Sequence, residues 1–133
     1  MNKTVPKQSP PFGWDRMPIE LKPLQALTLL RTLSLEQVRD EMPDLTTRQT
    51  AILLTIYLEP PPPHTVRGLA AKLNVTKPVI TRALDTMGAL EFVSRHRDEK
   101  DRRNVLVKRT VAGALYVEKL GDLVIAKARE LPL

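Results

Sequence analysis

Basic side chains are concentrated in the middle third of the chain, and their position narrows the chemistry that the protein can do. Residues 64–109 hold 11 Lys and Arg against 5 Asp and Glu, which accounts for the whole formal net charge of +6. The segments before and after this stretch carry equal numbers of each sign. Because a solvated surface usually mixes its charges, this concentration indicates a polyanionic partner.

One short segment of this stretch combines hydroxyl and basic side chains on the outward positions of a predicted helix. Thr76, Thr81 and Lys77 can reach phosphates. Arg82 can pair with a phosphate or a guanine edge, and Val79 can touch a thymine methyl group. An ordinary solvated face would explain each charge alone, but not the coincidence with a second basic segment. The candidate residues are Thr76, Lys77, Pro78, Val79, Thr81 and Arg82, with Asp85 on the same face.

The second basic segment is a run of charges, residues 96–104, between two short β-prone stretches, Phe92–Arg95 and Val105–Lys108. Partial alternation of apolar and polar residues on both sides predicts a hairpin with a charged tip. Its candidate residues are Arg95, Arg97, Lys100, Asp101, Arg102 and Arg103.

The helix of the first segment is the second member of a closely spaced pair. Thr65 can cap a helix over residues 66–73, Asn74 begins a tight turn, and Thr76 can cap the next helix, residues 77–90. Pro78 falls in its first turn, where a missing N–H costs nothing. Such a pair can insert its second helix into the major groove of DNA. Its predicted inward stripe is Ile80, Leu84 and Met87, with Ala83 beside it.

Further helices are predicted on the N-terminal side. Apolar residues recur at three- and four-residue spacing over residues 19–42, and Ser34 is a candidate N-cap that would divide this segment into two helices. Thr46 and Gln49 can form a capping box for the next helix, which the proline run at residues 60–63 must end.

The order of these elements predicts a mainly α fold with a small β-hairpin wing, a winged helix-turn-helix. We expect a flexible Pro-rich arm over residues 1–18 and one domain over residues 19–133, with a DNA-binding core at 45–109. The last helix, residues 111–131, is apolar on more than one side, which indicates a partner subunit. Together with residues 19–42 it is expected to form a homodimer.

Several segments resemble motifs of the MarR (multiple-antibiotic-resistance repressor) family over residues 45–120. Residues 45–49 are similar to its L-T-x-x-Q helix start, and residues 66–73 to V-x-x-L-A-x-x-L. Residues 75–85 are similar to its recognition helix, and residues 109–113 to the L-T-x-x-G start of the next helix. Residues 95–103 resemble R-x-x-D-x-x-D-x-R, the wing signature, which is the most specific of these matches.

The resemblance implies a dimeric transcriptional regulator, expected to be a repressor, that binds double-stranded DNA. Arg103 would enter the minor groove from the hairpin tip, where a narrow groove concentrates negative potential. Asp101 would hold the Arg103 guanidinium; the alternative, that Asp98 and Asp101 only pair with neighbouring arginines and shape the loop, is compatible with this role. The remaining wing cations would contact phosphates: Arg95, Arg97, Lys100 and Arg102.

Two positions and the number of helices after the wing depart from the family pattern. Glu91 stands where the family usually has Gly at the end of the recognition helix, and Glu is disfavoured in a left-handed turn. The helix is therefore expected to end differently, with Gly88 as a candidate for the turn. Pro78 replaces a small polar residue. One helix follows the wing here, whereas family members commonly add another, so the dimer geometry and any small-molecule pocket stay open.

The composition excludes other classes of protein. There is no cysteine, and His64 and His96 lie far apart, so no thiol chemistry, disulfide or metal site is expected. The five glycines are scattered and form no phosphate-binding loop. No cofactor or enzymatic activity is expected. With no apolar run near the roughly 20 residues of a membrane span, a cytoplasmic protein is expected.

One alternative function remains at this stage. A winged helix can serve as a protein-interaction module that docks on a transcription or replication component. The basic hairpin argues against this alternative, whereas Phe12 and Trp14 in the Pro-rich arm support it.

Overall fold

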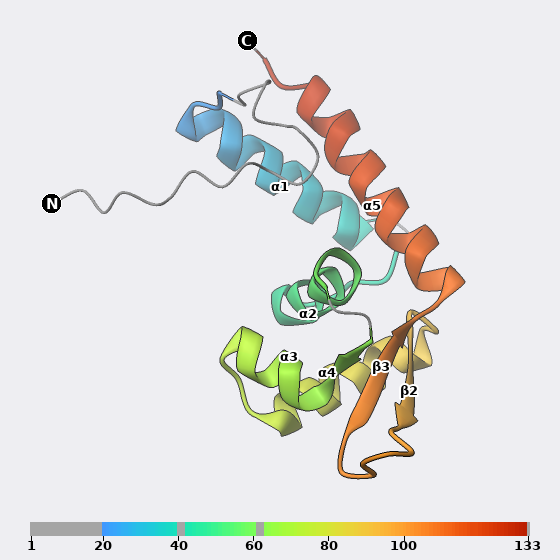
Figure 1. Ribbon diagram of the computed structural model, residues 1–133. Helices are drawn as coiled ribbons and strands as arrows, with labels where there is room; N and C mark the ends of the chain where they lie inside the picture. Colours follow the sequence, from blue (N-terminus) through green and yellow to red (C-terminus); the bar gives the residue numbers. More distant parts are fainter. Residues whose placement is uncertain (1–19, 40–41, 61–62, 133) are drawn as a thin grey trace, which may run out of the picture.

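The computed structural model describes residues 20–39, 42–60 and 63–132 of the chain. In the described ranges α1 and α5 lie side by side at one end of the molecule, and the other helices pack with a small sheet at the other end (Figure 1). This confirms a mainly α fold with a β-hairpin wing. The elements are α1 (Pro23–Arg39), α2 (Thr47–Leu58), β1 (His64–Thr65), α3 (Val66–Leu73), α4 (Lys77–Ala89), β2 (Val93–Arg97), β3 (Val105–Arg109) and α5 (Val111–Arg129).

Side-chain caps begin three of the helices. Thr46 accepts a hydrogen bond from the Gln49 N–H at 3.1 Å, and the Gln49 side chain accepts from the Thr46 N–H at 2.8 Å. These two bonds are the predicted capping box. Thr65 caps α3 and Thr110 caps α5, each accepting from a backbone N–H at 2.9 Å. Thr76 is the N-cap residue of α4, but its side chain makes no capping hydrogen bond.

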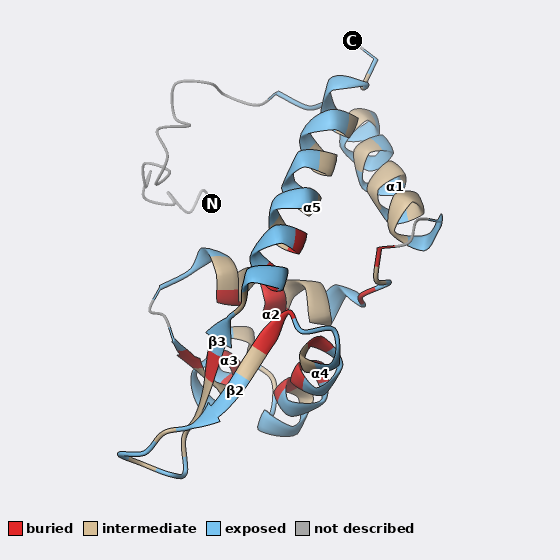
Figure 2. Cartoon of the chain, turned by 90° about the vertical axis from the view of Figure 1, so that its right-hand side faces the viewer, coloured by how far each residue is buried: buried red, intermediate tan, exposed pale blue. Residues whose placement is uncertain are grey.

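The hydrophobic core lies between α2, α3, α4 and the sheet, where the buried residues gather in Figure 2. The predicted inward stripe of α4 is buried in full. By contrast, α1 contains no buried residue, so it contributes little to this core. The largest fully buried side chains are Ile52, Leu53, Ile56, Leu69, Ile80, Leu84, Met87 and Val107.

The wing belongs to a three-stranded antiparallel sheet in the order β1-β3-β2. Val93 pairs with Arg109 and Arg97 with Val105, so the hairpin loop runs over residues 98–104. The sequence did not predict β1, in which His64 pairs with Val107. A two-residue strand has no periodicity of its own, and Thr65 gives only the signal of a helix cap.

The prediction that Ser34 divides the first helical segment is wrong. α1 continues through this residue, and the Ser34 hydroxyl donates to the Leu30 carbonyl at 2.8 Å. A serine whose hydroxyl is satisfied by the preceding turn does not need to end the helix. The helix is also shorter than predicted, because residues 20–22 and 42 are not helical.

The expectation that Gly88 would replace Glu91 at the end of α4 is also wrong. Glu91 itself adopts a left-handed conformation, with φ of 63°. Its N–H donates to the Gly88 carbonyl, and the Phe92 N–H donates to the Met87 carbonyl, both at 2.9 Å. These bonds form a Schellman motif, so the hydrogen bonds of the turn outweigh the strain of a non-glycine residue.

Tyr57 of α2 forms hydrogen bonds with residues at both ends of the wing hairpin. Its hydroxyl donates to the Phe92 carbonyl at 2.7 Å and accepts from the Thr110 N–H at 3.0 Å. Gly113 packs so closely here that a Cβ atom would overlap this hydroxyl. Arg109, at the end of β3, donates to the Ile56 carbonyl at 2.7 Å. The wing therefore projects from a fixed base.

Candidate nucleic-acid interface

The predicted residues of α4 lie on two flanks of the helix. Lys77 and Thr81 line a hollow toward the wing, whereas Val79 and Arg82 line another toward the N-terminus of α2. Val79 is half-buried, so it is less outward than predicted. Thr76 and Pro78 are exposed. α4 thus presents an exposed surface with polar groups on both sides.

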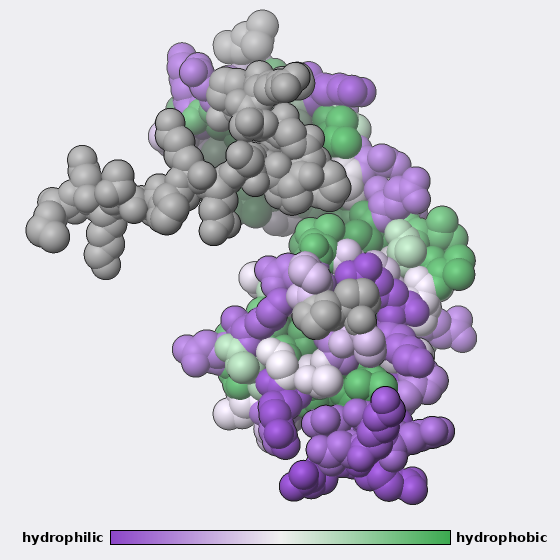
Figure 3. Space-filling model, in the orientation of Figure 1, coloured by the Kyte–Doolittle hydropathy of each residue, from purple (hydrophilic) through white to green (hydrophobic). Residues whose placement is uncertain are grey.

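The wing loop is shaped by its own backbone and by acidic side chains. The Asp98 N–H donates to the Asn104 carbonyl at 3.0 Å, and the Asn104 N–H donates to the Asp101 carbonyl at 2.9 Å. The Asp98 carboxylate accepts from the Lys100 N–H at 2.9 Å. Lys100 and Arg102 are exposed at the tip, where hydrophilic atoms gather at the bottom of Figure 3.

Asp101 holds the guanidinium of Arg103. Arg103 Nε donates to Asp101 Oδ1 at 3.1 Å, and the Arg103 backbone N–H donates to the same oxygen at 3.2 Å. These hydrogen bonds, the side-chain one foremost, lower the pKa of Asp101 below its ordinary value. The hydrogen bonds to Asp101 restrict the direction of the Arg103 side chain. Because this side chain is 84% exposed, its charge stays accessible to solvent.

An ion pair joins α4 to the wing. Arg95 Nη2 of β2 lies 2.7 Å from Asp85 Oδ1 of α4, and the two side chains are 35% and 61% exposed. Both residues were expected near the interface, but their contact was not predicted, because it depends on how β2 packs against α4. Arg97 is held against the wing loop, since its Nη1 donates a hydrogen bond to the Arg102 carbonyl at 2.8 Å.

Between α4 and the wing lie two adjoining hollows with basic linings. One, of about 400 Å³, is lined by Thr81 and by the β2 residues Arg95 and Arg97 among others. The other, of about 200 Å³, brings Arg67, Lys77 and Arg103 together from α3, α4 and the wing. Arg67 was not predicted to contribute, although it follows the apolar start of α3 in the region of excess charge. The hollows therefore collect cations from three elements.

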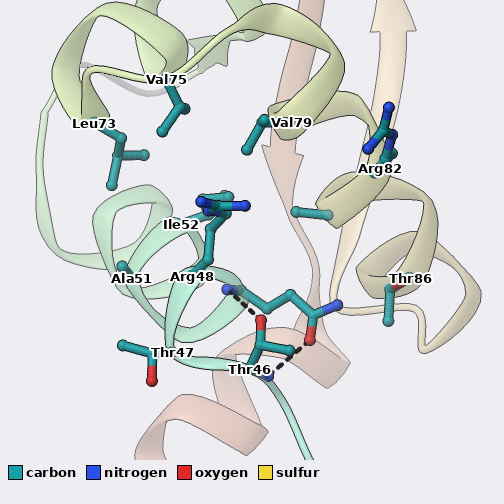
Figure 4. Close-up of a pocket in the computed structure, with 12 residues that line it drawn as sticks. Thr46, Thr47, Arg48, Ala51, Ile52, Leu73, Val75, Val79, Arg82 and Thr86 are labelled. Carbon is teal, nitrogen blue, oxygen red and sulfur yellow. Dashed lines mark hydrogen bonds between the residues drawn. The ribbon is translucent and has the colours of Figure 1, made fainter.

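The opposite flank of α4 borders a larger hollow, of about 810 Å³ (Figure 4). Arg48 comes from α2 and Arg82 from α4, and Leu73, Val75 and Val79 supply apolar walls. Arg48 was not predicted to contribute. Both arginines are exposed, and the hollow that they line begins at a helix N-terminus, so the positive surface extends beyond the wing side.

Other kinds of site find no support in the part of the chain that the structure describes. These residues contain no group of three His, Asp or Glu side chains placed to hold a metal ion. Among the helices of the described ranges, none combines the length and apolar character that crossing a membrane requires. Phe12 and Trp14, the aromatic residues of the Pro-rich arm, lie outside the described residues.

Comparison with known proteins shows which family this arrangement is similar to. Residues 45–105 match the model of the MarR family. A variant of MarR from E. coli complexed with operator DNA is 27% identical over 80% of this chain and 73% of its own, with a TM-score of 0.62. A second MarR structure from E. coli, also of a variant, is 26% identical over 84% of this chain and 83% of its own, with a TM-score of 0.63.

A more distant structure shares the fold. A variant of MepR from S. aureus bound to an oligodeoxyribonucleotide has a TM-score of 0.70 and 18% identity over 80% of this chain and 75% of its own. No curated protein sequence matches the chain. The family match spans the capped α2 helix, the helix-turn-helix and the wing up to the start of β3, and the winged-helix fold continues beyond it. The winged helix-turn-helix at residues 45–105 is thus similar to the MarR family, and the fold of the chain is shared with MarR from E. coli.

Proposed function

We propose that this protein is a sequence-specific DNA-binding regulator, acting in the cytoplasm as a repressor. The observation that carries the proposal is the pairing of an exposed recognition helix with a wing whose Arg103 is held by Asp101. A MarR variant of the same fold, 27% identical to this chain, was solved with operator DNA. In this proposal the DNA-binding core spans residues 45–109.

The two elements have different tasks. α4 enters the major groove, where Thr76, Lys77 and Arg82 contact phosphates or base edges. The wing lies on the adjacent minor groove, and Arg103 enters it, favouring A·T-rich flanks where the groove is narrow. The other wing cations, with Arg67 from α3, contact phosphates and set the register of the protein on the duplex.

The regulator acts as a homodimer. Two recognition helices related by a two-fold axis read half-sites about one helical turn apart, near 34 Å. α1 supplies apolar surface for the partner, because Leu24, Leu27 and Leu30 are each more than half exposed in the single chain. α5 packs on α1 and completes the dimerisation region.

A DNA titration at two salt concentrations tests the proposal. The probes are the duplex upstream of the protein's own gene and a scrambled duplex, and the mass of the protein in solution is measured alongside. We expect a dimer that prefers the upstream duplex and binds more weakly at higher salt, because neutralised phosphates release counterions. Absence of binding to both duplexes at low salt would contradict the proposal and favour a protein-docking module.

A single substitution distinguishes a specific contribution of the wing to DNA binding from the general effect of losing one positive charge. Arg103→Ala is expected to weaken binding to the preferred duplex by about tenfold or more, with the circular dichroism spectrum unchanged. Arg129→Ala, which removes an exposed arginine at the end of α5, is the control and is expected to leave the affinity nearly unchanged. Equal affinities for the wild type and the Arg103 variant would remove the wing from the interface.

A further inference from the structure

Asp85 places a negative charge on the side of α4 that faces the wing. It lies one helical turn after Thr81, and Thr81 lines the hollow of about 400 Å³ between α4 and β2. Arg95, on the opposite wall of this hollow, contacts the Asp85 carboxylate at 2.7 Å. The ion pair therefore lies across the gap between the two elements that we assign to DNA.

The path of the DNA backbone makes this gap important. If α4 occupies a major groove and the wing the adjacent minor groove, the strand that separates these grooves must pass between them. Its phosphates would then run along the hollow that Thr81, Arg95 and Arg97 line. The Asp85 carboxylate does not line this hollow, but it pairs with Arg95, which does. A carboxylate beside a phosphate path is unfavourable, because two unit charges about 4 Å apart repel by about 1 kcal/mol even in water.

Arg95 is consequently shared between two anions. Its guanidinium is exposed enough to reach a phosphate, yet in the free protein it is held by Asp85. Every DNA duplex has phosphates, so competition for Arg95 lowers the affinity for all sequences alike. A duplex that also satisfies the base contacts of α4 still binds through those contacts, whereas a duplex without them depends on phosphate contacts alone.

We propose that Asp85 competes with DNA phosphate for Arg95 and so lowers the affinity of the protein for every duplex, which keeps sequence-independent binding weak. This inference rests on the proposed DNA-binding function. It makes opposite predictions for the two partners: neutralising Asp85 strengthens binding, whereas removing Arg95 weakens it twice, by losing a cation and by leaving Asp85 unpaired.

The test is a double-mutant cycle in the full chain, with the wild type, Asp85→Asn, Arg95→Ala and the double variant. Each is titrated against the duplex that the wild type prefers and against a scrambled duplex, at two salt concentrations. Asp85→Asn is expected to bind the scrambled duplex about three- to tenfold more tightly, with a steeper salt dependence by about one phosphate contact. Arg95→Ala is expected to cost about tenfold or more alone, and clearly less in the Asp85→Asn background.

Asp122→Asn is the matched control, because it raises the net charge by the same amount from an exposed position on α5. Circular dichroism checks that each variant is folded, and Asp85→Ser serves as a second neutral variant. Weaker binding of both folded Asp85 variants would indicate that the pair only holds the wing in place, and would overturn the inference. A change equal to that of the control, or an additive cycle, would overturn it as well. Failure of the wild type to bind either duplex is a separate outcome, which would reject the proposed function and this inference with it.

Discussion

Arg103 is an example of a charged side chain that is both exposed and ordered. A free arginine on a surface loses about 2 kcal/mol of rotamer entropy when it is fixed in one direction. Asp101 meets part of this cost before any partner binds, because it accepts hydrogen bonds from both Nε and the backbone N–H of Arg103. The wing therefore presents its arginine in a restricted range of directions.

This contact predicts a pH dependence at the same residue. Arg103 lowers the pKa of Asp101, so the contact stabilises the wing fully above the ordinary pKa of an aspartate and is lost as the pH falls through the lowered value. Arg103→Ala is expected to raise the pKa of Asp101 toward its ordinary value in an NMR titration of the side-chain carboxyl. Arg102→Ala is the control, since the contact that Arg102 makes to Arg97 uses its backbone carbonyl. An Asp101 pKa that is the same in the wild type and the Arg103 variant would contradict the assigned cause.

Much of the candidate site was predictable from sequence because its signals are local. The capping box at Thr46, the buried stripe of α4 and the charged hairpin each follow from the spacing of neighbouring residues. The Asp85–Arg95 pair and the approach of Arg67 to the wing depend on packing between elements, so spacing along the chain gives no signal for them. The resemblance to the MarR family, in turn, indicated the Asp101–Arg103 contact but not the left-handed Glu91.

The end of α4 offers a prediction at the scale of a helix. Because Glu91 has a φ of 63°, its Cβ is strained in a way that glycine avoids. Glu91→Gly is expected to raise the free energy of unfolding by about 1 kcal/mol, as measured by urea denaturation. This value is the net gain once the extra conformational entropy that glycine gives to the unfolded chain has been subtracted. Glu91→Ala removes the same side chain but keeps the Cβ, so it should give no such gain. Equal stabilities of the two variants would show that backbone strain is not the cause.

The absence of a side chain at Gly113 allows α5 to pack closely against α2. A Cβ here would overlap the Tyr57 hydroxyl and the Phe92 carbonyl, whereas a Cβ at Gly121 would meet nothing within 4 Å. Gly113→Ala is therefore expected to lower the free energy of unfolding by about 1–3 kcal/mol. Gly121→Ala, in the same helix, should raise it by about 0.5–1 kcal/mol. Urea denaturation of both variants measures the difference, and a stabilised Gly113→Ala would contradict the close packing.

At the scale of the whole molecule, α1 and α5 form an antiparallel pair, and α5 alone of the two reaches the main core, through buried residues such as Gly113 and Tyr116. Gln25 Nε2 donates to the Pro132 carbonyl at 2.7 Å at one end, and Lys127 lies 3.7 Å from Glu36 further along. One side of α1 is thereby occupied, but no residue of this helix is buried in the single chain. Exposed apolar surface of this extent usually marks an interface.

Leu27→Glu tests whether this surface joins two subunits. Leu27 is 61% exposed in the single chain, so a glutamate should leave the helix intact while its charge prevents burial against a partner. We expect a monomer by analytical ultracentrifugation, with the helical circular dichroism signal largely retained. Affinity for the preferred duplex should fall by about 100-fold or more, because two half-sites are no longer bound by one linked pair of domains.

Leu58→Glu is the control for this prediction, since Leu58 is 67% exposed but lies at the end of α2. It should remain dimeric and bind the same duplex as the wild type does. If Leu27→Glu were still a dimer, the subunits would have to meet elsewhere, and the spacing of the two recognition helices would no longer follow from the α1 and α5 pair. If it were a monomer with undiminished affinity, one domain alone would account for recognition, and a half-site should then compete as well as the full site.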